Sequence, residues 1–158
     1  MIGADVAAFI DGPVMILVST RNDEGRAFIA RGTGARFDRA TGCIDVLVNS
    51  GLWPEVAGHA VPEARIAVTV VRPGDYRAYQ VKGRICEVAA ASGAEQARGR
   101  AYVERMFDVM GDLGVNRVQL SHTLTDWDLV RFSFTPTDLF VQTPGPGAGA
   151  RLAQMGAS

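Results

Sequence analysis

The stretch that most constrains the fold runs from residue 26 to residue 49 and predicts a β-hairpin. Small, apolar and basic side chains alternate over residues 28–37, and an apolar run returns over residues 43–48. The segment between them, residues 38–42, has turn chemistry and includes a glycine that can take a positive φ. The chain is therefore expected to build sheet here and not helix.

The first strand of this hairpin carries an unusual set of residues. Arg31 and Arg36 lie beside Gly32, Thr33 and Gly34. Glycine within a strand weakens it and often marks a bulge or a close approach to the backbone. Guanidinium groups bind phosphate through paired hydrogen bonds. This strand therefore predicts a binding place for an anion.

Period-two patterns elsewhere predict a barrel. Strands are expected over residues 14–20, 64–71, 76–88 and 127–135, with a short one at 139–143. Short helices are expected near residues 5–10 and after Pro54, and a long helix begins at the capping box of Ser92 and Glu95 and ends near Leu113. Strands dominate and the hairpins are short, which predicts a mainly β (β+α) fold, an antiparallel barrel of about six strands with helices packed against it.

One domain over residues 1–143 is expected, followed by a Gly/Pro-rich tail over residues 144–158. The tail could fold over a ligand as a lid, which would make Gln142 and Thr143 candidate contacts, or it could be a disordered end. Both alternatives stay open.

The net charge, the hydropathy and the cysteine content argue against several classes of protein. The formal net charge of -1 argues against a nucleic-acid partner. No apolar run approaches the ~20 residues of a membrane span, and the N-terminus lacks signal-peptide features. The two cysteines, Cys43 and Cys86, have no metal-site spacing, so two buried, reduced thiols in a cytoplasmic protein are expected.

Recognised catalytic motifs are absent from the sequence, and no catalytic residue is assigned. His59 and His122 are isolated and are interpreted as structural or solvated. Hydrogen-bond donors outside the first hairpin strand come from Ser50, Gln80 and Lys82. Together with the flat surfaces of Trp53 and Tyr76, these donors favour an aromatic ligand that carries phosphate.

The order of elements resembles the pyridoxamine 5'-phosphate oxidase-like FMN-binding split barrels. The resemblance is carried by the first hairpin, the basic strand leading into FDRATGCIDVLVNS, the short helix, ARIAVTVV and DYRAYQVKGR. It implies a six-stranded antiparallel split β-barrel with flanking helices. It also implies a homodimer that holds two FMN molecules at the subunit interface.

The resemblance further implies which residues hold the cofactor. The basic strand would supply arginines to the phosphate, the end of the next strand would line the ring or phosphate, and the longest strand would reach the cofactor in this subunit or its partner. Trp53 stands where the family has a Ser-Arg-Lys phosphate clamp. The expected cofactor-binding residues are Arg31, Gly32, Thr33, Arg36, Val48, Asn49, Ser50, Trp53, Gln80 and Lys82.

The C-terminal region departs from the pyridoxamine phosphate oxidases themselves. Those enzymes grip substrate with an Arg-Leu-His-Asp-Arg type segment, where this chain reads FVQTPGPGAG. Vitamin B6 oxidation is therefore not expected, and the leading hypothesis is an FMN-dependent oxidoreductase acting on an unknown small molecule. The alternatives are a non-enzymatic module that binds or senses flavin or haem, for which only His59 or His122 could be the axial ligand, and a deazaflavin-dependent reductase.

Overall fold

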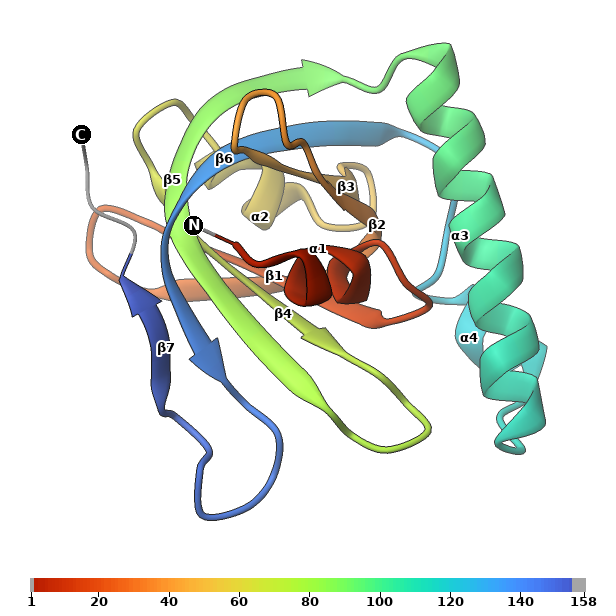
Figure 1. Cartoon of the computed structure of the whole chain (residues 1–158). Coiled ribbons are helices and arrows are strands. Elements are labelled where there is room, and N and C mark those ends of the chain that lie inside the picture. Colours follow the sequence, from red (N-terminus) through yellow and green to blue (C-terminus); the bar gives the residue numbers. More distant parts are fainter. Residues whose placement is uncertain (1, 155–158) are drawn as a thin grey trace.

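The strands pair into one antiparallel sheet within residues 2–154, the part of the chain that the computed structural model describes (Figure 1). The strand order is β3-β2-β1-β4-β5-β6-β7, and β3 also pairs with β6. This second pairing closes six strands into a barrel and leaves β7 as an extension. The strands are β1 (Met15–Arg21), β2 (Ala27–Phe37), β3 (Ile44–Asn49), β4 (Arg65–Val71), β5 (Ala78–Ala90), β6 (Leu129–Val141) and β7 (Arg151–Gln154).

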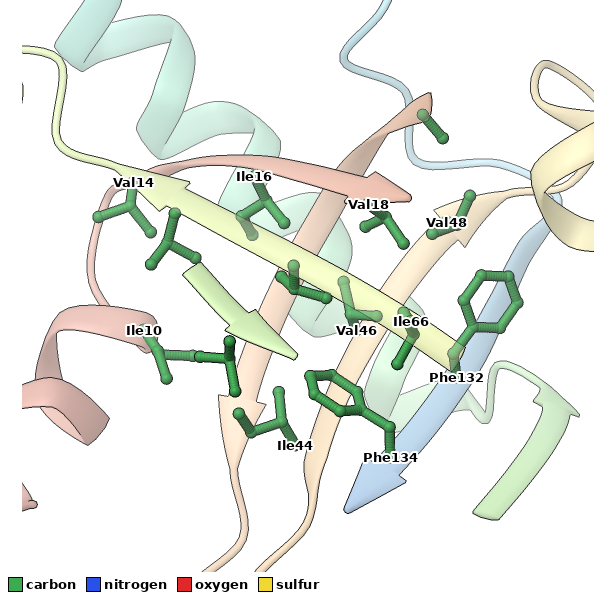
Figure 2. Packing of buried hydrophobic residues seen from close by; sticks show 14 of the residues in the cluster. Ile10, Val14, Ile16, Val18, Ile44, Val46, Val48, Ile66, Phe132 and Phe134 are labelled. Atoms are coloured by element: carbon green, nitrogen blue, oxygen red, sulfur yellow. The ribbon is translucent and has the colours of Figure 1, made fainter. Parts of the chain in front are cut away.

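Alternate side chains of the strands fill the barrel, as the period of two predicts (Figure 2). On β1, Ile16 and Val18 are fully buried, whereas Leu17 between them lies on the outer face. Phe132 and Phe134 of β6 are also fully buried, and Figure 2 shows their rings beside the other side chains of this core. Burial of these apolar side chains is the main stabilising contribution to the barrel.

Four helices flank the barrel in the part of the chain that the structure describes. They are α1 (Ala4–Ile10), α2 (Pro54–His59), α3 (Gly93–Asp112) and α4 (Arg117–Ser121). Figure 1 shows α1 at one open end of the barrel and α3 along its side. At α2, the Thr20 hydroxyl of β1 donates to the Val56 carbonyl at 3.1 Å. None of the described helices combines the length and the apolar character that crossing a membrane requires.

The long helix α3 begins as the sequence predicts. The Ser92 hydroxyl accepts a hydrogen bond from the Glu95 N–H at 3.2 Å, and the Glu95 carboxylate accepts one from the Ser92 N–H at 2.8 Å. Tyr102 and Met106 of α3 are buried against the barrel, whereas Leu113, near which the helix was expected to end, is exposed.

Three local expectations differ from the structure. The expected loop in the tail includes β7, which pairs with β6 from Asp138 to Phe140. Residues 115–126, for which the sequence pattern predicts neither helix nor strand, contain α4, and the two strands expected at 127–135 and 139–143 form the single strand β6. Pro136 is tolerated within β6 because the register with β5 shifts beside it, between Lys82 and Gly83.

The two cysteines are free, but the prediction that they are buried is wrong. Cys43 is half-buried and Cys86 is exposed, and their Sγ atoms are 3.8 Å apart. Strand β6 pairs with β3 on one side and with β5 on the other, which places those two strands about 10 Å apart. A disulfide needs Cα atoms within about 7 Å, so this arrangement favours two thiols.

Candidate functional site

A groove of about 500 Å³ lies on the outer face of the barrel. It crosses β1, β4, β5 and β6 near one end of the sheet. Its outward-facing cationic side chains are Arg21, Arg65, Lys82 and Arg84, all of them exposed. The volume lies within the range of ordinary ligand pockets. We refer to it as the basic groove.

The three arginines among these cationic side chains form a row across the neighbouring strands β1, β4 and β5. Arg65 is directly opposite Arg84 in the β4–β5 pairing. Because Ser19 is opposite Ala67 in the β1–β4 pairing, Arg21 follows at the level of Arg65. Like charges opposite one another in a sheet are destabilising. A bound anion would reduce the repulsion between these three arginines.

The contacts of these three arginines do not neutralise their positive charge. Arg84 donates to the Glu63 carbonyl at 3.1 Å, and within residues 2–154 no ion pair joins Arg21, Arg65 or Arg84 to a carboxylate. A shallower hollow of about 450 Å³ borders the same three arginines and carries acidic side chains beyond ion-pair distance from them, namely Asp23, Glu24 and Glu63.

The opposite wall of the groove is mixed in character. Lys82 is opposite Asp138 in the β5–β6 pairing, and its ammonium lies 4.7 Å from the centre of the Phe140 ring. Asp138 forms an ion pair with Arg151 of β7 at 3.2 Å. The C-terminal strand therefore supports a residue that lines the groove.

Apolar surface continues from the groove along the outer face. Leu17 of β1 is 39% exposed and Ile29 of β2 is 61% exposed. Ile29 pairs with Ser19, which lines the groove. Gln80 also lies on this face, where its side-chain amide donates to the Thr69 hydroxyl at 3.0 Å. Apolar surface beside a cationic row fits a ligand with a flat ring and an anionic group.

Arg31 and Arg36 both lie on the outer side of β2, but in different surroundings. They are five positions apart, which would place them on opposite faces of a regular strand, and the β-bulge between Gly32 and Ala35 reverses the alternation. Arg31 is half-buried and donates to the Met15 sulfur at 3.0 Å, and its Nε has no hydrogen-bond partner within the described chain. Burial lowers the pKa of Arg31.

Arg36 lines a second cavity of about 330 Å³, between β2, the end of α1 and helix α3. Two further arginines from α3, Arg98 and Arg105, line the same space. The structure therefore groups Arg36 with residues of α3 and not with Arg31.

The other expected residues of β2 and β3 are buried. Gly32 faces the core, where an added Cβ would lie 2.5 Å from a methyl group of Ile16. Thr33 is also buried, and its carbonyl lies 3.6 Å from the position of a Cβ at Gly99 of α3. Val48 is a core residue of β3.

Asn49, Ser50 and Trp53 gather where β3 leads into α2. The Asn49 amide donates to the Thr125 hydroxyl at 2.8 Å, and its carbonyl oxygen accepts from the Leu52 N–H at 2.8 Å. The Ser50 hydroxyl donates to the Asp128 carbonyl at 3.1 Å. The polar groups of Asn49 and Ser50 therefore organise the connection itself, whereas the Trp53 indole N–H is buried without a hydrogen-bond partner in the described chain. None of the three lines the basic groove.

The histidines are not placed for ligation in either cavity. The His59 ring stacks on Phe28 with centroids 4.9 Å apart, and His122 is exposed after α4. Within the described residues, no group of three or more His, Cys, Asp or Glu side chains could hold a metal ion.

Five arginines in the two cavities were not expected from the sequence: Arg21, Arg65, Arg84, Arg98 and Arg105. The sequence contains only a weak signal for these arginines. Arg65 and Arg84 occupy outward positions in clear alternating patterns, but only the register of β4 against β5 places them side by side.

Solved structures of low sequence identity share this fold. An F420 reductase superposes with a TM-score of 0.52 at 14% identity, covering 84% of this chain and 93% of that protein. HupZ from group A Streptococcus superposes with a TM-score of 0.54 at 15% identity, covering 94% of this chain and 100% of HupZ. The split-barrel fold implied by the sequence resemblance is thereby confirmed. No family model matches the sequence, and no curated protein matches it.

Proposed function

We propose that this chain binds a phosphorylated cofactor of the flavin class, FMN or a deazaflavin, in the basic groove. The row of Arg21, Arg65 and Arg84 is the observation that carries this proposal. The anionic end of the cofactor would lie against the row, where guanidinium groups give charge-assisted hydrogen bonds. The ring would lie over the apolar surface at Leu17 and Ile29.

The proposed activity is an oxidoreduction of a small molecule. A bound flavin supplies hydride or electron transfer, and the protein provides binding and orientation. The residues that line the groove fit this division, because they are mainly cationic and hydroxyl side chains, and the one carboxylate among them, Asp138, is paired with Arg151. Gln80 and Lys82, expected from the sequence, extend donors from β5 along the same face.

A spectrum of the freshly purified protein and a cofactor titration test the proposal. We expect bound flavin absorbance, or saturable binding of FMN or coenzyme F420 by the apoprotein. Riboflavin, which lacks the phosphate, should bind at least about tenfold more weakly than FMN, because a hydrogen bond to a charged group contributes about 1.5–3 kcal/mol. A protein that binds neither cofactor would remove the proposal.

Substitution of the row separates its contribution from that of the ring surface. The double variant Arg65→Gln/Arg84→Gln should weaken FMN binding at least about tenfold and leave riboflavin binding unchanged. Arg100→Gln is the matched control, because Arg100 is an exposed residue of α3 that lines neither cavity. An equal loss of FMN affinity in Arg100→Gln and in the double variant would show that FMN binding depends only on the overall charge of the protein and not on the row.

Turnover distinguishes an enzyme from a binding module on the same barrel. An enzyme should oxidise a reduced nicotinamide or reduced deazaflavin donor in the presence of an electron acceptor. Cofactor binding without turnover for any donor and acceptor pair would favour the non-enzymatic alternative. Comparison of FMN with coenzyme F420 in the same assay separates the two cofactor classes.

The proposal includes a homodimer that covers the apolar part of the outer face. Leu17 and Ile29 are large, exposed apolar side chains on adjacent strands, which is the kind of surface that a partner buries. Ile29→Glu should convert the dimer into monomer in light scattering at micromolar concentration, whereas Val118→Glu on α4 should not. Wild-type protein that is monomeric throughout this range would contradict the expectation.

A further inference from the structure

The two cysteines of the chain meet on the outer face of the barrel, although 43 positions separate them in the sequence. Cys43 comes directly before β3 and Cys86 lies on β5, with β6 between these two strands. The residues next to them, Ile44 and Ile85, are fully buried in the core, so alternation places both cysteines outside. Their Sγ atoms are 3.8 Å apart. We refer to the two thiols as the dithiol pair.

A β-bulge gives Cys86 its position. Ile85 is opposite Phe134 in the β5–β6 pairing. The next matched pair is Glu87 with Ser133, which leaves Cys86 as the extra residue of β5. Its thiol donates to the Ser133 carbonyl at 3.1 Å. The bulge therefore turns the sulfur towards β6, and so towards the strand beyond it.

The turn before β3 holds Cys43 from the other side. The Cys43 carbonyl accepts a hydrogen bond from the Asp38 N–H at 2.9 Å, and the Cys43 N–H donates to the Thr41 hydroxyl at 3.3 Å. The Cys43 sulfur lies 3.9 Å from the hydroxyl oxygen of Thr135 on β6. Both sulfurs thus reach over β6 from backbones that are fixed by hydrogen bonds.

The distance between the sulfurs suits a bridging ion better than a direct bond. Because β6 lies between β3 and β5, the Cα atoms are too far apart for a disulfide without movement of the strands. Two metal–sulfur bonds of about 2.3 Å would span the 3.8 Å at a sulfur–metal–sulfur angle of about 110°, which is close to tetrahedral. One ion can therefore contact both sulfurs where they already lie.

The contacts of the sulfurs argue against a nucleophilic role. Reactive cysteines are activated by a neighbouring cation or by a helix N-terminus. The dithiol pair instead contacts oxygen atoms of Thr41, Ser133 and Thr135, and in residues 2–154 no cationic side chain donates a hydrogen bond to either sulfur. Coordination of an ion needs no such activation by a neighbouring residue.

We propose that Cys43 and Cys86 bind one thiophilic divalent cation of the Zn²⁺ class. Thiolate ligands select such ions over Mg²⁺ and Ca²⁺. Each thiol releases its proton to solvent as its sulfur coordinates, so two thiolates balance the two charges of the ion. The described chain supplies no third His, Cys, Asp or Glu ligand. The remaining positions are open to water, because Cys86 is exposed and Cys43 is half-buried.

This site is separate from the basic groove. Neither cysteine lines the groove, and the oxygen atoms around the dithiol pair belong to residues that do not line it either. The proposal therefore does not rest on the proposed cofactor.

A Cd²⁺ titration of the reduced, metal-free full chain tests the proposal, because cadmium–thiolate bonds absorb in the ultraviolet and report sulfur coordination directly. We expect an absorbance change that saturates at one ion per chain and is reversed by Zn²⁺. Cys43→Ser and Cys86→Ser should each weaken Cd²⁺ binding at least about tenfold, since even the groups that support a metal ligand commonly contribute that much. Cys86 is exposed, so Cys86→Ser keeps the test decisive if Cys43→Ser unfolds.

His122→Gln is the matched control, because His122 is exposed and imidazole is the commonest adventitious metal ligand. Its Cd²⁺ affinity should equal that of the wild type, and Zn²⁺ should protect both wild-type thiols from a maleimide reagent. An equal loss in His122→Gln, or half an ion per chain, would overturn the proposal. So would the absence of saturable binding. Spontaneous loss of both thiols as an intramolecular disulfide in the metal-free protein would also overturn it, because the sulfurs would then pair directly.

Discussion

Replacing Phe134 with alanine is expected to lower the free energy of unfolding by about 3–5 kcal/mol. Phe134 has no exposed surface and lies on β6, where Ile44 of β3 is opposite it on one side and Ile85 of β5 on the other. Its ring therefore lies at the barrel seam, where β6 pairs with β3 on one side and with β5 on the other. Truncation would leave a cavity that strands held on both edges cannot collapse to fill.

Urea denaturation followed by circular dichroism measures this change. Val118→Ala is the matched control, because the Val118 side chain is 67% exposed on α4, and its effect should stay within about 0.5 kcal/mol. Comparable shifts of the two midpoints would mean that the seam is not the tightly packed centre described above.

Replacing Gly83 with alanine is the second large effect, and it acts by overpacking. An added Cβ would lie 2.3 Å from the backbone oxygen of Thr135 and 2.6 Å from the Phe134 ring. A backbone oxygen cannot rotate away, so β5 and β6 must separate. Overpacking of this kind costs typically about 1–3 kcal/mol and occasionally more.

The same substitution should disturb the basic groove, because Gly83 lies between Lys82 and Arg84 in its lining. We expect a lower unfolding midpoint together with weaker FMN binding. Gly74→Ala provides the control, since no atom lies within 4 Å of its added Cβ and its effect on both readouts should be small. A Gly83→Ala protein as stable as Gly74→Ala would contradict the close β5–β6 packing.

Much of the barrel could be predicted because its signals are local. Alternating patterns on β1, β4 and β5 identified buried faces, and the reciprocal hydrogen bonds of Ser92 and Glu95 fixed the start of α3. The elements that were not predicted lack such a local signal. Strand β7 is four residues long and follows a segment rich in proline and glycine, so it depends on pairing with β6 and has no strong pattern of its own.

The candidate sites were harder to predict because they depend on register. Arg65 and Arg84 are 19 positions apart and meet only through the β4–β5 pairing, and Arg36 meets Arg98 only because α3 packs across β2. The prediction that Arg31 and Arg36 carry cofactor phosphate stays a prediction. Glycine as a marker of close approach was a sound expectation, but at Gly32 the approaching group is the Ile16 side chain.

Barrel closure through β3 and β6 has a consequence for synthesis of the chain on the ribosome. The seam pairs Ile44 with Phe134, so every strand from β1 to β5 is made before its closing partner. Until β6 emerges, the edges of β3 and β5 are unpaired and can recruit strands from neighbouring nascent chains. Conditions that slow translation beyond β5 therefore favour association between unfinished copies, and chaperone demand should be greatest at that stage.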